Sequence, residues 1–106
     1  MIAIQTANLT KKYGDIIAIN GVDLEVEAGE IVGCLGPERS GKTTLLRLLT
    51  GLVRPTLGDS TVLGLSSVKE SRKLRAKSGI VTDTAACIGS MSALENLLMF
   101  ASMYGM

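Results

Sequence analysis

The stretch that decides the fold is residues 36–43, which reads Gly-Pro-Glu-Arg-Ser-Gly-Lys-Thr. Gly36 and Gly41 have no Cβ, so the backbone between them can curl tightly and approach an anion closely. A curled backbone turns successive N–H groups inward and forms a concavity that holds phosphate oxygens. Lys42 adds a mobile positive charge for the outer phosphates, and the Thr43 hydroxyl is a ligand of the kind that Mg²⁺ prefers. The octet therefore predicts a phosphate-binding loop.

The octet fits the pattern G-x-x-x-x-G-K-[ST], which is confirmed by a strand before it and a helix after it. Residues 30–35 form a short, mostly apolar run, which predicts a buried strand. Residues 43–50 have helical character, with a stripe at i, i+3, i+4 and i+7 formed by Leu45, Leu48, Leu49 and Leu52. Leu46 adds apolar surface beside the stripe, so we expect the helix to be covered on most sides. Its N-terminus would point free N–H groups at the loop. The alternative is a glycine-rich turn that binds nothing, and the context favours the loop.

Composition indicates a globular protein and excludes several kinds of catalytic and metal-binding site. The chain has 106 residues, of which 46% are hydrophobic and 20% charged, as expected for one small globular domain, residues 1–106. The net charge of +1 gives no support for a nucleic-acid partner. The absence of histidine from the sequence excludes Ser-His and Cys-His catalysis and His-ligated metals. Cys34 and Cys87 lack metal or redox spacing, and we expect Cys34 to be a small core residue.

The sequence has neither a signal-peptide pattern at its start nor an uncharged apolar stretch long enough to cross a bilayer. If the protein works at a membrane, another chain must supply the spanning part. The pattern is still helical at Met106, and the chain looks cut rather than finished.

The first third predicts a small antiparallel sheet. The expected strands are residues 2–9, 16–19 and 22–26, and the expected turns are Tyr13-Gly14-Asp15, Asn20-Gly21 and Ala28-Gly29. Further along, a turn at residues 57–59 precedes a short strand near residues 61–63, and Ile80-Val81 indicates another strand. Arg54-Pro55 marks a boundary, because the residue before proline avoids the helical region.

Two capping boxes predict the remaining helices. Residues 67–70 should start a helix that runs to about Ala76, and residues 92–95 should start another. The basic residues of the first helix read as a solvated face. The apolar stripe of the second reads as core, with Leu94, Leu97, Leu98 and Ala101.

These elements, in this order, resemble the ATP-binding domain of ABC transporters. The resemblance extends from Leu9 to Gly105. It is strongest in the amino-acid sequences of residues 9–15, 29–33, 41–52, 54–58 and 95–97. It implies an α/β, P-loop NTPase-like fold with an N-terminal antiparallel β subdomain and a Walker A strand and helix, truncated after its N-terminal part. Within the family, the sequences of residues 62–65 and 99–101 are more similar to those of multidrug or polysaccharide exporters.

The resemblance also implies a function. The chain would hold Mg-ATP as part of an ABC-type ATPase that powers transport across a membrane. The implied partners are a separate transmembrane permease subunit and a second ATP-binding subunit, and the implied location is the cytoplasmic, inner face of the membrane. Tyr13 would stack on the adenine ring, which suits an aromatic face, although packing against its own hairpin is the alternative. Lys42 would be the catalytic residue, and the cofactor-binding residues would be Tyr13, Gly36, Glu38, Arg39, Ser40, Gly41, Lys42, Thr43 and Thr44.

Three departures from the family pattern qualify this picture. Glu38 and Arg39 stand where the family usually has Asn and Gly. Glu38 would repel polyphosphate, and Arg39 could either offset that charge or, if position 39 needs positive φ, strain the backbone, so we expect weaker nucleotide binding. Asp83 stands where the family has a Gln that contacts Mg²⁺; it could ligate the metal beside Thr43 or be an ordinary loop residue. The family's signature motif, Walker B carboxylates and switch histidine lie beyond this chain, so we expect the isolated chain not to hydrolyse ATP.

Two other functions stay open at this point. The chain could be a non-hydrolysing or degenerate fragment that binds nucleotide or phosphate. It could instead be another P-loop enzyme such as a small kinase, with Asp83 as a metal carboxylate, although the opening antiparallel strands argue against a kinase.

Overall fold

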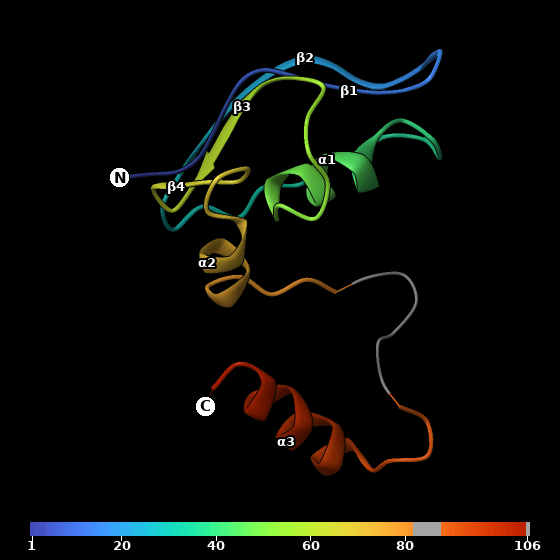
Figure 1. Ribbon diagram of the computed structural model, residues 1–106, viewed down its shortest axis with the longest axis vertical. Helices are drawn as coiled ribbons and strands as arrows, with labels where there is room; N and C mark the ends of the chain where they lie inside the picture. The colour runs from blue at the N-terminus through green and yellow to red at the C-terminus, as the bar shows by residue number, and fades with distance from the viewer. Residues whose placement is uncertain (82–87, 106) are drawn as a thin grey trace.

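The computed structural model describes residues 1–81 and 88–105, which form an antiparallel sheet and three helices (Figure 1). The strand order in the sheet is β2-β1-β3-β4. The strands are β1 (Ile2–Tyr13), β2 (Ile16–Glu27), β3 (Leu57–Val62) and β4 (Leu65–Ser66). The helices are α1 (Lys42–Leu49), α2 (Ser71–Ala76) and α3 (Ala93–Met103). The predicted antiparallel β subdomain, followed by a phosphate-loop helix, is confirmed.

The first two strands form one long hairpin that closes at Gly14, where the predicted turn is confirmed. The turn predicted at Asn20-Gly21 is wrong, because β2 continues through both residues. Gly21 has a φ of 61° and lies where the register between β1 and β2 shifts. Its N–H donates to the Thr10 hydroxyl at 3.0 Å, so a side chain satisfies the backbone at this irregularity.

The core joins this hairpin to α1. The buried side chains at its centre are Leu9, Ile19 and Leu48, with Val22, Leu45 and Val53 packed against them. Leu48 thus occupies the core as its helical spacing predicts. The expectation that α1 is covered on most sides is wrong, since Leu46 is 49% exposed and Leu52 54% exposed. Only one face of α1 meets the sheet.

The strand predicted at residues 30–35 does not form. Ile31 and Leu35 are 102% and 97% exposed, and Cys34 is exposed rather than in the core. A strand needs a neighbour for its N–H and C=O groups, and the sheet of the described residues does not include this segment. Ile80-Val81 is likewise not a strand, with Val81 97% exposed.

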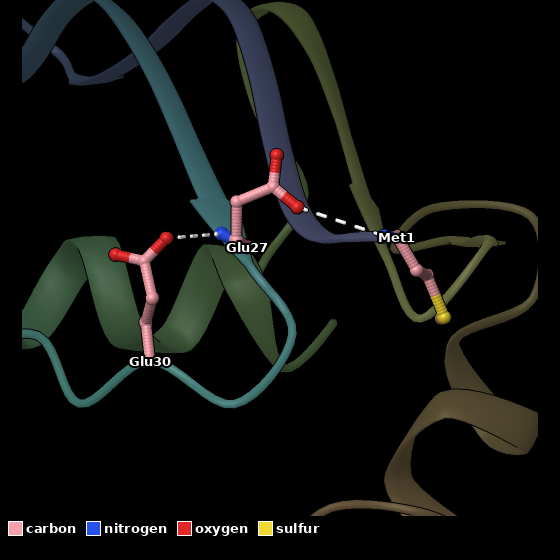
Figure 2. Close-up of polar contacts among 3 residues, drawn as sticks. All are labelled: Met1, Glu27 and Glu30. Atoms are coloured by element: carbon pink, nitrogen blue, oxygen red, sulfur yellow. Dashed lines mark hydrogen bonds and ion pairs between the residues drawn. The ribbon is translucent and has the colours of Figure 1, made fainter.

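The exit from β2 towards residues 30–35 is a polar turn, as predicted for Ala28-Gly29 (Figure 2). The Glu27 N–H donates to Glu30 Oε1 at 2.9 Å, and the Glu30 N–H donates to the Glu27 carbonyl at 3.3 Å. The N-terminal ammonium of Met1 lies 3.6 Å from Glu27 Oε2, with both side chains more than half exposed. An exposed ion pair of this kind contributes about 0–1 kcal/mol, so the hydrogen bonds set the direction of the chain.

Helix α1 ends in a Schellman motif. The Leu52 N–H donates to the Arg47 carbonyl at 2.9 Å and the Gly51 N–H to the Leu48 carbonyl at 3.2 Å, with Gly51 at a φ of 78°. The turn predicted at residues 57–59 is wrong, because these residues begin β3 and pair with β1 across a register shift.

Helix α2 begins three residues later than its predicted capping box requires. Glu70 is the N-cap without a side-chain capping bond, because its Oε1 instead accepts from the Ser66 N–H at 3.2 Å. The predicted end at Ala76 is confirmed.

Helix α3 has the predicted capping box, but its apolar stripe is not core. Leu94, Leu97 and Leu98 are 64%, 69% and 61% exposed. The buried residue of the helix is Asn96, whose side chain bonds the backbone of residues 88–92. None of the described helices is long and apolar enough to cross a membrane.

The capping box of α3 predicts a pH response. The Ser92 backbone N–H, with the Ser92 side chain, lowers the pKa of Glu95 below its ordinary value of 4.5. A lowered pKa in the folded state means that the contribution is present above the ordinary pKa and is lost as the pH falls through the lowered one. We expect the first turn of α3 to fray below pH 4.5, as followed by Cα chemical shifts of residues 93–96. Glu95→Gln should remove this step, and an unchanged step in that variant would contradict the assignment.

Candidate phosphate-binding loop

The loop between residues 36 and 41 is curled. The Ser40 N–H donates to the Pro37 carbonyl at 3.3 Å, which closes a turn with Glu38 and Arg39 at its centre. Arg39 and Gly41 have positive φ values of 63° and 97°, and Ser40 between them does not. A tight turn with positive-φ residues can turn successive N–H groups to one side and form an anion-binding nest.

The loop is anchored on β2 through Gly41. A Cβ built on Gly41 would collide with the carbonyl oxygen of Ala18 and would lie 3.0 Å from Ile19 Cδ1. The positive φ of Gly41 is a second reason for glycine here. Ile19 belongs to the core that also contains Leu48 of α1, so the same packing holds the helix start and the loop.

The first turn of α1 supplies further N–H groups. The N–H groups of Lys42, Thr43 and Thr44 have no acceptor within the helix, because they precede its first hydrogen bond. Gly41 is the N-cap and has no side chain to cap them, and the first turn holds no acidic residue. The helix dipole adds partial positive charge at the same place. This end of α1 is thus suited to an anion.

The side chain of Lys42 connects the two ends of the loop. Its Nζ donates to the carbonyl oxygen of Gly36, which joins the end of the octet to its beginning. A Cβ built on Gly36 would lie 2.7 Å from Ser40 Oγ, so the two ends of the loop are in close contact. The octet is compact and its ammonium group lies against the loop backbone.

Glu38 and Arg39 are exposed at the tip of the turn. Arg39 does adopt positive φ, the condition under which the sequence predicts strain. A non-glycine residue in this conformation costs roughly 1–2 kcal/mol. Glu38 places a carboxylate on the turn next to the nest, where it would repel a polyphosphate.

Tyr13 ends β1 at the tip of the hairpin and is 46% exposed. Its ring lies 5.1 Å from Lys11 Nζ, a cation–π distance. Tyr13 pairs with Ile16, which is two residues, or about 7 Å of strand, from the Ala18 that anchors the loop. The hairpin tip and the loop lie on the same side of the molecule (Figure 1).

The metal-binding prediction rests on two residues. Thr43 is exposed in the first turn of α1, where its hydroxyl is accessible. Asp83 lies outside the described residues. Within the part of the chain that the structure describes, no cluster of three or more His, Cys, Asp or Glu side chains forms a metal site.

The structure places the octet and Thr44 around the N-terminus of α1, and Tyr13 on the neighbouring hairpin. Sequence reasoning missed Ala18, whose carbonyl oxygen fixes the position of Gly41. An alanine within a strand carries no local signal for this role, so only the tertiary contact reveals it.

The sequence and the fold agree with known proteins. The profile of the ABC transporter family matches residues 19–104. The chain belongs to the ABC transporter family. The match begins within β2 and includes the loop and all three helices.

Curated relatives are ATP-binding proteins. The chain is 37% identical over 103 residues to the probable multidrug ABC transporter ATP-binding protein YbhF of Escherichia coli (strain K12), covering 97% of this chain and 18% of the relative. It is 38% identical over 105 residues to the Nod factor export ATP-binding protein I of Rhizobium meliloti (strain 1021), covering 99% of this chain and 31% of the relative. The chain therefore spans about a fifth to a third of the length of these relatives.

A solved structure gives the same fold. The dimeric ABC transporter cassette MJ0796 is 32% identical, with a TM-score of 0.84 over 95% of this chain and 47% of the cassette. The same cassette is also known in a post-hydrolysis state bound to ADP and phosphate. The P-loop NTPase-like fold expected from the sequence is thereby confirmed.

Proposed function

We propose that the chain binds Mg-ATP through residues 36–44 as the phosphate-loop portion of an ABC ATPase that powers transport across a membrane. The observation that carries the proposal is the curled loop fixed between β2 and the open N-terminus of α1. Membership of the ABC transporter family supports it, because the curated relatives are ATP-binding proteins of transporters. A small kinase is not favoured by these relatives.

Each residue of the loop has a role in this proposal. The N–H groups of residues 38–44 cradle the phosphates, and Lys42 stabilises the β- and γ-phosphates by moving from the Gly36 carbonyl to the ligand. Thr43 offers its hydroxyl to Mg²⁺, which when bound would neutralise phosphate charge. Tyr13 stacks on the adenine ring. Asp83 is proposed as a further oxygen ligand of the metal.

We further propose that these residues alone do not complete the hydrolytic reaction. Phosphoryl transfer requires a group that positions the attacking water as well as groups that hold the phosphates. The described loop supplies the second kind, with Lys42 as its catalytic residue. The whole protein would act at the cytoplasmic face of a membrane with a permease subunit and a second ATP-binding subunit. The dimeric state of the related cassette supports the second ATP-binding subunit.

Two measurements on the 106-residue chain test the proposal. Titration with ATP and Mg²⁺ in a calorimeter should show binding, and a phosphate-release assay should show no turnover. A chain that binds neither ATP nor inorganic phosphate would overturn the proposed function. Steady phosphate release would overturn the non-hydrolysing part while leaving ATP binding intact.

The tip of the loop should limit affinity. We expect Glu38→Asn combined with Arg39→Gly to tighten ATP binding by up to about fivefold, because the pair removes a carboxylate that repels the phosphates and exposed charge interactions are worth about 0.2–1 kcal/mol. Arg39 has positive φ in the described loop, so the loss of roughly 1–2 kcal/mol of backbone strain should raise the stability of the loop rather than its affinity. Calorimetry with ATP measures the change. Arg54→Gly, at an exposed position away from the loop, controls for the replacement of an arginine by glycine. An unchanged affinity in the double variant would refute the prediction.

A further inference from the structure

The positive charge of the chain is concentrated around α2. Residues 69–77 hold five of the 11 basic residues and one of the 10 acidic ones. This segment therefore carries a charge of +4, and the remainder of the chain carries −3, which together give the net +1. A nearly neutral chain thus contains one strongly basic segment.

The basic side chains are clustered along the chain around α2. Arg72 and Lys73 lie within the helix, and Lys69 and Lys77 lie in the turns that flank it. All four are exposed, whereas Leu74 is 0% exposed and packs into the protein. We call these four residues the basic face of α2. Figure 1 shows α2 below β4, beyond the sheet.

The other two charged residues of the segment, Glu70 and Arg75, make hydrogen bonds to the backbone of the protein. Arg75 is partly buried and donates from Nη1 to the Gly51 carbonyl at 3.1 Å. Glu70 accepts from the Ser66 N–H. Among the described residues the ion pair within 4 Å is that of Met1 with Glu27, so no described carboxylate pairs with the basic face.

We propose that the basic face of α2 binds the anionic headgroups of a membrane. Clusters of four or more Lys and Arg residues on a helix are attracted to anionic lipid surfaces. Besides Arg72 and Lys73, the exposed residue of α2 is Ala76, which has no large apolar side chain to insert, so the contact is electrostatic. The choice of a membrane over other polyanions rests on the proposed function in membrane transport. Aromatic residues, which stack on bases in many nucleic-acid sites, make up 3% of the chain and are absent from residues 66–81.

Vesicle flotation tests the proposal without nucleotide. The chain should float with vesicles of equal parts phosphatidylcholine and phosphatidylglycerol and not with phosphatidylcholine alone. Lys69→Gln, Arg72→Gln and Lys73→Gln together should weaken binding about 100-fold, because each charge near the surface contributes about fivefold. A control triple with the same loss of charge, Lys12→Gln, Arg47→Gln and Arg54→Gln, changes exposed residues elsewhere and should weaken binding far less. Salt at roughly 0.5 M should also release the chain.

Several outcomes would overturn the proposal. These are equal binding to neutral vesicles, equal losses in the two triples, or loss of binding to a short RNA duplex in the α2 triple while vesicle binding is unchanged. Replacing Lys69 and Lys73 by arginine should preserve flotation, which separates lost charge from lost folding. ATP titration of the same variants should match the wild type, so a failure of ATP binding and a failure of membrane binding are read separately.

Discussion

Gly41→Ala is expected to destabilise the chain by about 2–5 kcal/mol and to abolish nucleotide binding. The alanine would have to keep the φ of 97° that Gly41 has, which costs roughly 1–2 kcal/mol. It would also collide with the Ala18 carbonyl oxygen, and overpacking of this kind costs about 1–3 kcal/mol. The rigid neighbour is backbone of β2, so relief would require the loop to leave the strand.

Urea unfolding and ATP calorimetry measure the two effects. Gly33→Ala is the matched control, because an added Cβ there meets nothing within 4 Å and Gly33 does not have positive φ. We expect the control to change stability by less than about 0.5 kcal/mol. Wild-type stability and ATP affinity in Gly41→Ala would show that the loop is not held on β2.

Lys42→Met should lower the affinity for Mg-ATP about 10- to 100-fold with a smaller effect on stability. Hydrogen bonds to charged groups contribute about 1.5–3 kcal/mol, and the ammonium group is placed to transfer its bond from Gly36 to a phosphate oxygen. Methionine keeps most of the side-chain volume and its helix propensity, so α1 should persist.

Calorimetry against Mg-ATP, with circular dichroism to confirm the helix, measures this effect. Lys12→Met is the control, since it removes the same charge from an exposed position on β1. Equal affinity in Lys42→Met and Lys12→Met would mean that the octet does not hold the phosphates.

The sequence predicts the parts of the fold that depend on local chemistry. The octet places the curled loop and α1, and Ser92 with Glu95 places the start of α3. The alternation of apolar residues predicts the antiparallel sheet. Ser92 and Glu95 act on backbone three residues away, and the alternation of apolar residues marks the buried face of each strand, so the local pattern carries the information.

The failures have a different origin. Asn20-Gly21 is a strong local turn signal, but Thr10 on the neighbouring strand satisfies the Gly21 N–H and keeps β2 continuous. Residues 30–35 and the leucines of α3 have strand-like and core-like patterns without a covering neighbour in the described residues. Ala18 acquires its role only by tertiary contact with Gly41. Sequence periodicity indicates which face can be buried, and it does not say what will cover it.

The loop is therefore anchored at one end more firmly than at the other. Gly41 rests on a strand of the sheet, whereas the approach through residues 31–35 is exposed and unpaired. Ordering of this approach on nucleotide binding would cost roughly 1–2 kcal/mol per residue of backbone at 25 °C. The dissociation constant of this chain for ATP would then depend on two terms. One is the conformational entropy lost by residues 31–35, and the other is the strength of the contacts between the loop and the phosphates.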